Sequence, residues 1–418
     1  DLGLLKLDVL GIRMQSSMAH AVAEIKRVDD VEVDLDDQAQ VPFDDPETYA
    51  MISSAKTLGV FQIESPGQRE LIGKSGIDDF GEIITDISLF RPGPVKSDMI
   101  SPYLDVKHGW KQASYLHDDL RPILEQTNGV VVFHEQVIQL IGELTGITYA
   151  EADEKRRALG SVDGMAATKV WFYPRALGRG YQLGFVEQIW TVIEAFASFG
   201  FCKAHAAAFA LPTYQSAWLK THWPAHFLAG VLTHDPGMYP KRLILDDVRR
   251  LGIAVLGLDV NDSEATYVVE PLDRDDLGDR AGRASASPAT RSPHPTAHRY
   301  GIRLSLSEVK GINAGEVGRI VAARPYASLT DFWHRARVSR PIVERLVLAG
   351  AFDSVYGIGL RGSRGEVSAR SRVTRRDLLL QVAELERFGK AVERAGRGRG
   401  LAGRRVARHG SQSSARSR

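Results

Sequence analysis

The sequence is nearly free of cysteine and contains no long apolar run. Cys202 is the only cysteine in 418 residues, so no internal disulfide can form. No run of about 18 apolar residues is present, and the N-terminus has no basic segment followed by an apolar one. From these absences we expect a cytoplasmic protein with no membrane partner.

An initiator methionine is also lacking, since the sequence opens on Asp1 inside an apolar pattern. We therefore expect that an upstream part of the protein is missing and that this chain is a fragment. Its 418 residues are 44% hydrophobic and 25% charged, a composition that can bury a large core. This length and composition predict two or three globular domains.

The net charge is divided unevenly along the chain. From Ile358 onward there are 16 basic and 5 acidic residues, which leaves 37 basic and 47 acidic residues before it. The two parts cancel to a net charge of +1. An acidic body does not attract nucleic acid as a whole, so any DNA contact has to come from local basic clusters.

The hydrophobic pattern predicts a mainly α-helical protein with small α/β parts. Turn signals at "SPG", "RPGP" and "TNG" divide the helical stretches, and an apolar-poor segment separates a second compact unit. The expected parts are a strand and helix in 1–40, a large helical domain in 41–230, an α/β connection in 231–269, a disordered linker in 270–299, a compact unit in 300–357 and a basic, largely disordered tail in 358–418 with one helix in "RRDLLLQVAELERF".

Asp8 lies inside "LLKLDVLG", a run that reads as a buried strand. A buried carboxylate without a partner costs several kcal/mol, so a compensating group is required. An ion pair with Lys6, two residues earlier on the same strand face, is one solution. A metal ion is the other, because Mg²⁺ binds one or two carboxylates together with substrate phosphates.

The segment "TYAEADEKRRALG" has a clear helix signature. Thr148 and Glu151 have the spacing of a capping box, and Gly160 is a stop signal, so a helix is predicted over 149–159. Arg156 and Arg157 then lie in its last turns. They either compensate the helix dipole or offer guanidinium groups to a phosphate chain.

The stretch "FGFCKAHAAAFAL" places Lys203 and His205 at the start of an alanine-rich helix. Positive charge at a helix start opposes the dipole, so local stability does not explain these residues. A snorkelling lysine and a hydrogen-bonded histidine remain the alternative. The rings of this region, Phe199, Phe201, Phe209 and Tyr214, are expected either in a core or on a stacking surface.

Two further sequence patterns bear on zinc binding and on DNA binding. His222 and His226 are four residues apart, but Pro224 lies between them and no Glu follows the first, which argues against zinc. "VKGINAGEVGRIVAAR" has the form of a helix-hairpin-helix element. In it Gly311 and Gly315 allow a tight turn whose amides can meet a phosphate, with Lys310 and Arg319 nearby.

"SRPIVERLVLAGAFDSV" is the expected partner of that hairpin, with Leu346, Leu348 and Phe352 in the core. A simple helical bundle without DNA contacts is the alternative.

Taken in order, "LLKLDVLGI", "LGVFQIES", "LFRPGP", "YLHDDLRPILEQTNGVVVFHEQV", "EADEKRRALG" and "AFASFGFCKAHAAAFALPTYQSAWLKTHWPAHF" resemble successive motifs of the bacterial C-family DNA polymerases. The resemblance covers 1–261, with weaker similarity through 300–355. "HDPGMYPKRLILDDVRRLGIAVLGLDVN" is most similar to the error-prone members of the family.

The resemblance implies the end of a polymerase palm in 1–40, a fingers domain in 41–230 and a tandem helix-hairpin-helix unit in 300–357. It implies a catalytic, metal-binding role for Asp8, the third of three family aspartates, and places Lys6 near the active site. The nucleotide-binding residues it implies are Arg156, Arg157, Lys203 and His205. The implied cofactor is Mg²⁺, and the implied partners are a DNA primer-template, deoxynucleoside triphosphates, a sliding clamp and accessory proteins.

The sequence departs from the family pattern at two places. Cys202, Lys203, Ala204 and His205 stand where the family has Asn-Lys-Ser-His, and the lost polar groups suggest looser nucleotide selection. Pro212 is expected to interrupt a helix that is continuous in the family.

Three functions remain open. The preferred one is template-directed nucleotidyl transfer, with this chain inactive alone because two aspartates are missing. The others are a non-catalytic DNA-binding module built on Lys310, Gly311, Gly315 and Arg319, and a structural subunit of an assembly.

Overall fold

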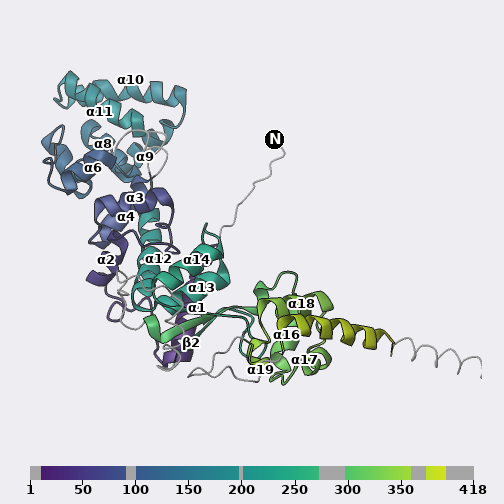
Figure 1. Cartoon of the computed structure of the whole chain (residues 1–418). Helices are drawn as coiled ribbons and strands as arrows, with labels where there is room; N and C mark the ends of the chain where they lie inside the picture. The colour runs from purple at the N-terminus through teal and green to yellow at the C-terminus, as the bar shows by residue number, and fades with distance from the viewer. Residues whose placement is uncertain (1–10, 91–99, 197–200, 273–296, 359–372, 392–418) are drawn as a thin grey trace, which may run out of the picture. The chain divides into compact units, whose positions relative to one another are not determined.

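The computed structural model describes residues 11–90, 100–196, 201–272, 297–358 and 373–391. The chain forms two compact units, Asp1–Leu251 with Ala289–Ala297, and Gly252–Pro288 with His298–Arg418. Figure 1 labels many of the elements of both units. None of the helices in these described ranges has the length and apolarity needed to cross a membrane.

The described part of the first unit is helical. Its helices are α1 (Arg13–Asp29), α2 (Pro46–Ser53), α3 (Pro66–Ser75), α4 (Phe80–Leu89), α6 (Ile100–Lys107), α7 (Arg121–Leu124), α8 (His134–Thr145), α9 (Tyr149–Ala158), α10 (Val162–Gly178), α11 (Leu183–Phe196), α12 (Lys203–His222), α13 (Pro224–His234) and α14 (Lys241–Arg250), with 3₁₀ turns at Asp118–Leu120 and Glu125–Thr127. The mainly helical prediction for this region is confirmed.

Side-chain caps define several helix starts. Ser65 accepts a hydrogen bond from the Gln68 amide at 3.3 Å, with Pro66 as the first residue of α3. Asp79 caps α4 by accepting from the Glu82 amide at 3.0 Å. The predicted "SPG" turn signal is therefore the start of a helix.

Helix α12 is the central element of the first unit, and it contacts α1, α2, α4 and α13 (Figure 1). Its second half is buried, and the Tyr214 hydroxyl donates to the Pro42 carbonyl. The helix runs through Pro212 without ending, so the predicted interruption is wrong. Pro212 is buried among packed neighbours, which hold the helix although the proline lacks an amide donor.

Lys220 on α12 is almost fully buried. Its ammonium donates to the carbonyls of Lys56 and Leu58, at 2.9 and 2.6 Å, and to Asp247 Oδ2 at 2.8 Å. Burial lowers the pKa of Lys220, and the charge of Asp247 opposes that effect. The lysine thus ties the loop before α3 and helix α14 to α12.

Helices α8, α10 and α11 enclose a separate apolar core at one end of the unit (Figure 1). Its largest fully buried side chains are Phe172, Trp190 and Phe196. Helix α9 packs on α8 and contributes Ala152. This end of the unit carries two of the predicted nucleotide-binding residues.

The second unit contains a small sheet. Its strands are β1 (Ala254–Leu256), β2 (Val268–Pro271) and β3 (Tyr300–Arg303), in the order β1-β3-β2. β3 pairs parallel with β1 and antiparallel with β2. Arg303 on β3 forms an ion pair with Glu270 on β2 at 2.6 Å. This ion pair joins two strands that lie at the two ends of the predicted linker.

The helices of the second unit surround one apolar core. They are the 3₁₀ turn η4 (Leu306–Glu308) and the helices α16 (Ala314–Ala322), α17 (Leu329–Ala336), α18 (Arg340–Ala349) and α19 (Asp353–Tyr356). A further 3₁₀ turn, η3 (Ala297–Arg299), directly precedes β3. Leu346 and Phe352 are fully buried, as predicted, but Leu348 is 59% exposed. Leu348 lies off the buried stripe of α18, which explains why this core assignment was wrong.

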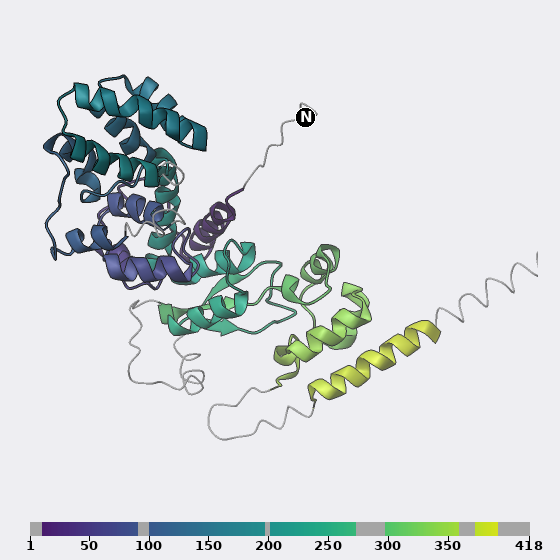
Figure 2. The ribbon, with the colours of Figure 1, turned by 90° about the horizontal axis from the view of Figure 1, so that it is seen from above.

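A further helix over 375–391 follows (Figure 2). Leu378 and Val382 are buried in the same core, and Gln381 donates to Thr330 Oγ1 at 3.0 Å. The predicted helix in the basic tail is confirmed, and it packs on the second unit.

Two of the predicted domain boundaries can be compared with the observed units and elements. The division between the units falls at Leu251, so α14 belongs to the first unit and β1 to the second, although both lie in the predicted connection 231–269. The predicted linker 270–299 begins within β2 and ends within η3. Residues 273–296 lie outside the described residues.

Candidate nucleotide-binding and DNA-binding sites

Two of the predicted site residues are not in the described part of the chain. Asp8 and Lys6, with the strand predicted around them, belong to residues 1–10. Their proposed metal-binding and catalytic roles therefore stay predictions. The other predicted residues are all described.

Helix α9 positions Arg156 and Arg157. Its capping box is confirmed, because Thr148 Oγ1 accepts from the Glu151 amide at 3.3 Å and Glu151 Oε2 accepts from the Thr148 amide at 2.9 Å. Both arginines pair with Asp153, Arg156 Nε at 2.9 Å and Arg157 Nη2 at 2.7 Å.

The shared carboxylate changes what the two arginines can offer a ligand. The hydrogen bond from Arg156, with that from Arg157, keeps the pKa of Asp153 below its ordinary value, so Asp153 is ionised at neutral pH. A phosphate that binds here has to compete with this carboxylate. Arg157 is the more exposed of the two.

The start of α12 is capped by a residue from another helix. Cys202 stands at the N-cap position and accepts no capping hydrogen bond. Glu135, in the first turn of α8, accepts from the Lys203 amide with both oxygens, at 3.0 and 2.9 Å, and from Cys202 Sγ at 3.4 Å. A carboxylate at this position satisfies a free amide and interacts favourably with the helix dipole.

The ionisation of Glu135 fits this role. Burial alone would raise the pKa of its carboxyl, but hydrogen bonds from the Lys203 amide and its neighbours outweigh burial, so the pKa lies below the ordinary value. Glu135 therefore remains charged at neutral pH.

The side chain of Lys203 has neutral partners in the described structure. Its ammonium donates to Gln126 Oε1 and lies 5.6 Å from the ring centroid of Phe133. Neither partner cancels the positive charge. Among the described residues, the Lys203 ammonium therefore forms no ion pair of its own, although the Glu135 carboxylate binds the backbone amide of the same residue.

The first turn of α8 lies near the arginines of α9 and contacts the start of α12. The His134 amide donates to the Phe201 carbonyl at 2.9 Å, which holds α8 against the start of α12. Burial lowers the pKa of His134, and the nearby charge of Arg156 lowers it further. The charge of Arg156 thus acts on the first turn of α8, and Glu135 of that turn binds the Lys203 amide of α12.

His205 is exposed on the first turn of α12. Its ring contacts those of Phe201 and Phe209 edge to face, with centroids 5.2 and 4.2 Å apart. The histidine is therefore part of a ring cluster as well as a source of positive charge.

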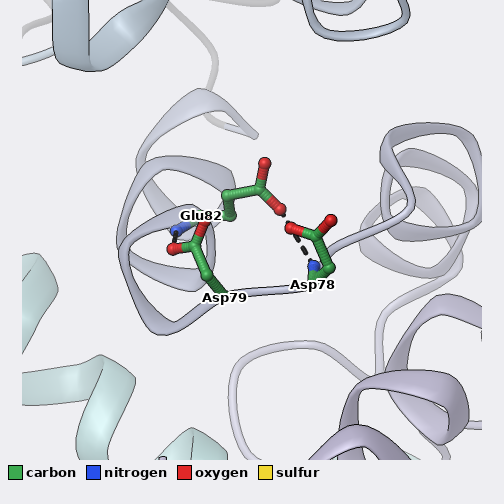
Figure 3. A group of neighbouring side chains, drawn as sticks. All are labelled: Asp78, Asp79 and Glu82. Atoms are coloured by element: carbon green, nitrogen blue, oxygen red, sulfur yellow. Dashed lines mark hydrogen bonds between the residues drawn. The ribbon is translucent and has the colours of Figure 1, made fainter. Parts of the chain in front are cut away.

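An acidic cluster at the start of α4 has ordinary structural roles (Figure 3). One ligand oxygen from each of Asp78, Asp79 and Glu82 lies within 4.8 Å of the others. Asp79 caps the helix, Glu82 accepts from the Asp78 amide at 3.0 Å, and Lys107 pairs with Glu82. These contacts account for the cluster, and it carries no metal assignment.

The two histidines of the rejected zinc pattern, His222 and His226, have separate partners. His222 Nε2 lies 2.7 Å from Asp45 Oδ2, and His226 Nε2 lies 3.0 Å from Asp29 Oδ2. Each ring is oriented by its own aspartate on a different element. The described geometry agrees with the rejection of a His222–His226 zinc site.

The predicted hairpin forms between η4 and α16. Gly311 has φ +82°, a left-handed conformation that favours glycine, so the turn predicted there is confirmed. Gly315 lies in the first turn of α16, where Asn313 and Glu316 form a capping box. This leaves the amides of the first helical residues at the predicted phosphate-facing end.

The two basic residues of the hairpin differ in their surroundings. Arg319 donates to the carbonyls of Ala336 and Arg337, at 3.2 and 3.3 Å, and so closes the C-terminal end of α17. Lys310 is exposed, and its carbonyl accepts from Arg345. Lys310 is therefore placed for solvent contact, whereas Arg319 has a structural role.

Known families match both units. A family model described as "Bacterial DNA polymerase III alpha subunit finger domain" matches residues 14–180, and one described as "Helix-hairpin-helix motif" matches residues 252–360. The folds and motifs thus define a polymerase fingers segment followed by a helix-hairpin-helix segment. The chain belongs to the bacterial C-family DNA polymerases, the family of the DNA polymerase III alpha subunit.

Individual relatives are similar over most of the chain. The error-prone DNA polymerase of Symbiobacterium thermophilum is 37% identical over 365 residues, which cover 85% of this chain and 32% of that protein. The error-prone DNA polymerase of Teredinibacter turnerae is 33% identical, with 85% and 33% covered. The DNA polymerase III subunit alpha of Aquifex aeolicus is 33% identical, with 84% and 29% covered. The chain thus spans about a third of the length of these relatives.

Sequence reasoning missed three residues that contact the predicted nucleotide-binding residues. Glu135 caps α12, Asp153 forms ion pairs with both arginines, and Gln126 accepts a hydrogen bond from the Lys203 ammonium. Asp153 is three and four residues before the arginines, a spacing that predicts helical ion pairs. Glu135 and Gln126 are far from Lys203 in sequence, so no local pattern could have identified them.

Proposed function

We propose that this chain is the fingers and helix-hairpin-helix segment of a DNA-directed DNA polymerase that performs template-dependent nucleotidyl transfer. The main support is that the first turn of α8, within the segment 14–180 that matches the finger-domain model, neighbours two predicted cations: the charge of Arg156 acts on His134, and Glu135 binds the Lys203 amide of α12. Arg157 and His205 complete the proposed triphosphate-binding set. Segments 1–40, 41–230 and 300–357 would serve as palm end, fingers and DNA-binding unit.

The cations of the fingers would bind the phosphates of an incoming nucleotide electrostatically. Lys203 offers a charge without a carboxylate partner, and Arg157 an exposed guanidinium beside Asp153. Positive groups fixed before the ligand arrives need little reorganisation. Their role would be to orient the triphosphate toward the primer end.

Asp8 would hold Mg²⁺, with Lys6 close by. Bound magnesium would neutralise phosphate charge and lower the pKa of the primer hydroxyl. Because two further aspartates are expected from outside this chain, we expect no primer extension by the 418-residue chain alone. Robust extension in the presence of Mg²⁺ would show that the catalytic carboxylates have been misassigned.

The error-prone relatives support a role in damage-tolerant synthesis during DNA repair. Cys202 and Ala204, in place of the family's Asn and Ser, would loosen nucleotide selection by removing polar contacts. A sliding clamp and accessory proteins would be partners, and the cytoplasm the location. Unchanged misincorporation after Cys202→Asn in the complete polymerase would contradict the selection hypothesis.

Equilibrium binding of a deoxynucleoside triphosphate tests the nucleotide site directly. The Arg156→Ala/Arg157→Ala variant should bind at least about tenfold more weakly than the unaltered chain, because two phosphate partners are lost. Arg249→Ala, which removes an exposed arginine paired with Asp246 on α14, is the matched control. Equal affinity in all three proteins would refute the assignment.

The helix-hairpin-helix match and the left-handed Gly311 favour a second function, a DNA-binding module without catalysis. It predicts salt-dependent duplex binding that survives Asp8→Asn and deletion of 203–211. Removal of both Lys310 and Arg319 would then abolish most of the binding. Loss of DNA binding on deletion of 203–211 instead would favour the polymerase function.

A further inference from the structure

Four aromatic rings form a row along the start of α12. Phe201, His205 and Phe209 follow one another at intervals of four residues, and Phe61 extends the row from the loop before α3. The ring centroids of neighbours lie 5.2, 4.2 and 5.5 Å apart in that order. Their edge-to-face and tilted contacts fix the orientation of each ring.

The row is at the surface, although Phe201 also packs against a small core that contains Phe133 and Ala206. His205 is exposed and the three phenylalanine rings are half-buried, whereas Tyr214 on the same helix is fully buried. Ala204 and Ala208, each one residue before a ring of the row, are exposed and small. A flat ligand can therefore approach these rings without meeting a large neighbouring side chain.

Buried contacts hold Phe61 at its place in the row. Its amide donates to Ser216 Oγ on α12 at 3.2 Å, and Lys220 binds the carbonyls of Lys56 and Leu58 in the same loop. Gln62, which follows, has φ +61°, a strained conformation for a residue other than glycine. The loop is thus held in a costly conformation that places Phe61 beside Phe209.

The positive charge of Lys203 near the row suits the phosphates of a nucleotide. Lys203 lies near the Phe201 end of the row, because its ammonium is 5.6 Å from the ring centroid of Phe133, which forms an isolated parallel bridge with Phe201. Its ammonium has neutral partners, so a phosphate can bind at that end while a base occupies the rings. Aromatic side chains bind bases of any sequence because every base has a π-face.

We propose that Phe201, His205, Phe209 and Phe61 form a stacking surface for the nucleobase of a nucleotide bound by the fingers. The proposal rests on the proposed function, because it takes a nucleotide as the ligand. It adds a base-binding part to a site whose other residues contact only phosphate. Phe209, with ring neighbours on both sides, is the central member.

Two ligands separate base binding from phosphate binding. The full chain is titrated with dATP and with inorganic tripolyphosphate, which lacks base and sugar. We expect Phe209→Ala to weaken dATP binding about tenfold and to leave tripolyphosphate binding unchanged. Phe209→Tyr should retain the affinity for dATP, because it keeps the ring.

Phe61→Ala should reproduce the selective loss from a different element, and Trp110→Ala, which removes a ring that is 72% exposed, should change neither affinity. Equal losses for both ligands, or none, would overturn the stacking surface. Wild-type binding of tripolyphosphate and dATP with the same affinity would also overturn it, while leaving the phosphate site intact. Binding of neither ligand would overturn the proposed function as well.

Discussion

Both carboxylate oxygens of Glu135 accept a hydrogen bond from the backbone amide of Lys203, at 3.0 and 2.9 Å. A residue of α8 thus caps α12, where Cys202 provides no cap of its own. The contact joins two helices of the first unit and fixes the backbone that carries Lys203 and His205. It also places a negative charge at the helix end that was expected to face phosphate.

Removal of this cap should destabilise the protein. Glu135→Ala leaves the start of α12 without a hydrogen-bond acceptor, and we expect a loss of about 1–2 kcal/mol in the free energy of unfolding. Urea denaturation followed by circular dichroism measures the change. Glu154→Ala, at an exposed position of α9, is the control and should be nearly neutral.

Asparagine is a preferred N-cap residue, so Cys202→Asn in the Glu135→Ala background should restore part of the lost stability. If Glu135→Ala is as stable as Glu154→Ala, the interhelical cap does not contribute.

Neutralising Asp153 should strengthen phosphate binding. Asp153→Asn releases Arg156 and Arg157 from a shared carboxylate, so we expect an increase of about two- to fivefold in the affinity for tripolyphosphate. The modest size follows from solvent screening of exposed pairs. Asp246→Asn, which releases Arg249 on α14, should have no effect, and a similar gain there would indicate a nonspecific charge effect.

The buried carboxyl of Asp86 should make stability depend on pH. Burial raises the pKa of Asp86 to about 8, and its Oδ2 atom has no hydrogen-bond partner among the described residues. Ser75 contacts the other oxygen at 3.5 Å, with the charges of Lys107 and Glu82 nearby. Between pH about 4 and 8 the unfolded chain is ionised at this group while the folded chain retains the proton.

Folding therefore takes up a proton in this range, and stability falls as the pH rises. Asp86→Asn removes this titration, so its stability relative to the original chain should increase from pH 5 to pH 8, by at most about 1.4 kcal/mol per pH unit. Urea denaturation of both proteins at the two pH values measures the difference. A difference that does not change with pH would show that Asp86 is already ionised in the folded protein.

The two basic residues of the hairpin should separate stability from DNA binding. Arg319→Ala removes two hydrogen bonds to the end of α17, and we expect a loss of about 1–2 kcal/mol in stability. Lys310→Ala should leave stability unchanged, weaken duplex binding and lower the slope of log affinity against log salt by about one. Thermal denaturation and binding at three salt concentrations measure these effects.

Reduced duplex affinity for Arg319→Ala without loss of stability would restore its predicted role as a DNA contact. Unchanged affinity and salt slope for Lys310→Ala would remove Lys310 from the DNA-binding surface.

The sequence was a good guide wherever the interactions are local. The capping box at Thr148, the turn at Gly311 and the helix over 375–391 were all predicted, because caps, turns and hydrophobic periodicity depend on residues a few positions apart. The mainly helical class followed from the same patterns. Ordered motifs also indicated the family.

Contacts between distant segments were decided by the tertiary structure alone. Pro212 was expected to interrupt its helix, but packing from α2, α4 and α13 outweighs the missing amide. Arg319 was expected to face DNA, yet it binds carbonyls at the end of α17. Glu135 and Phe61 reach α12 from segments more than 60 residues away in sequence.

The amino-acid sequence by itself thus determined the helices, the turns and the family, because these depend on short-range chemistry. Which cations lack a carboxylate partner, and which rings lie at the surface, was decided only by folding. A charge or a ring acquires its environment from side chains that the chain brings together over long separations, and no local pattern records those neighbours.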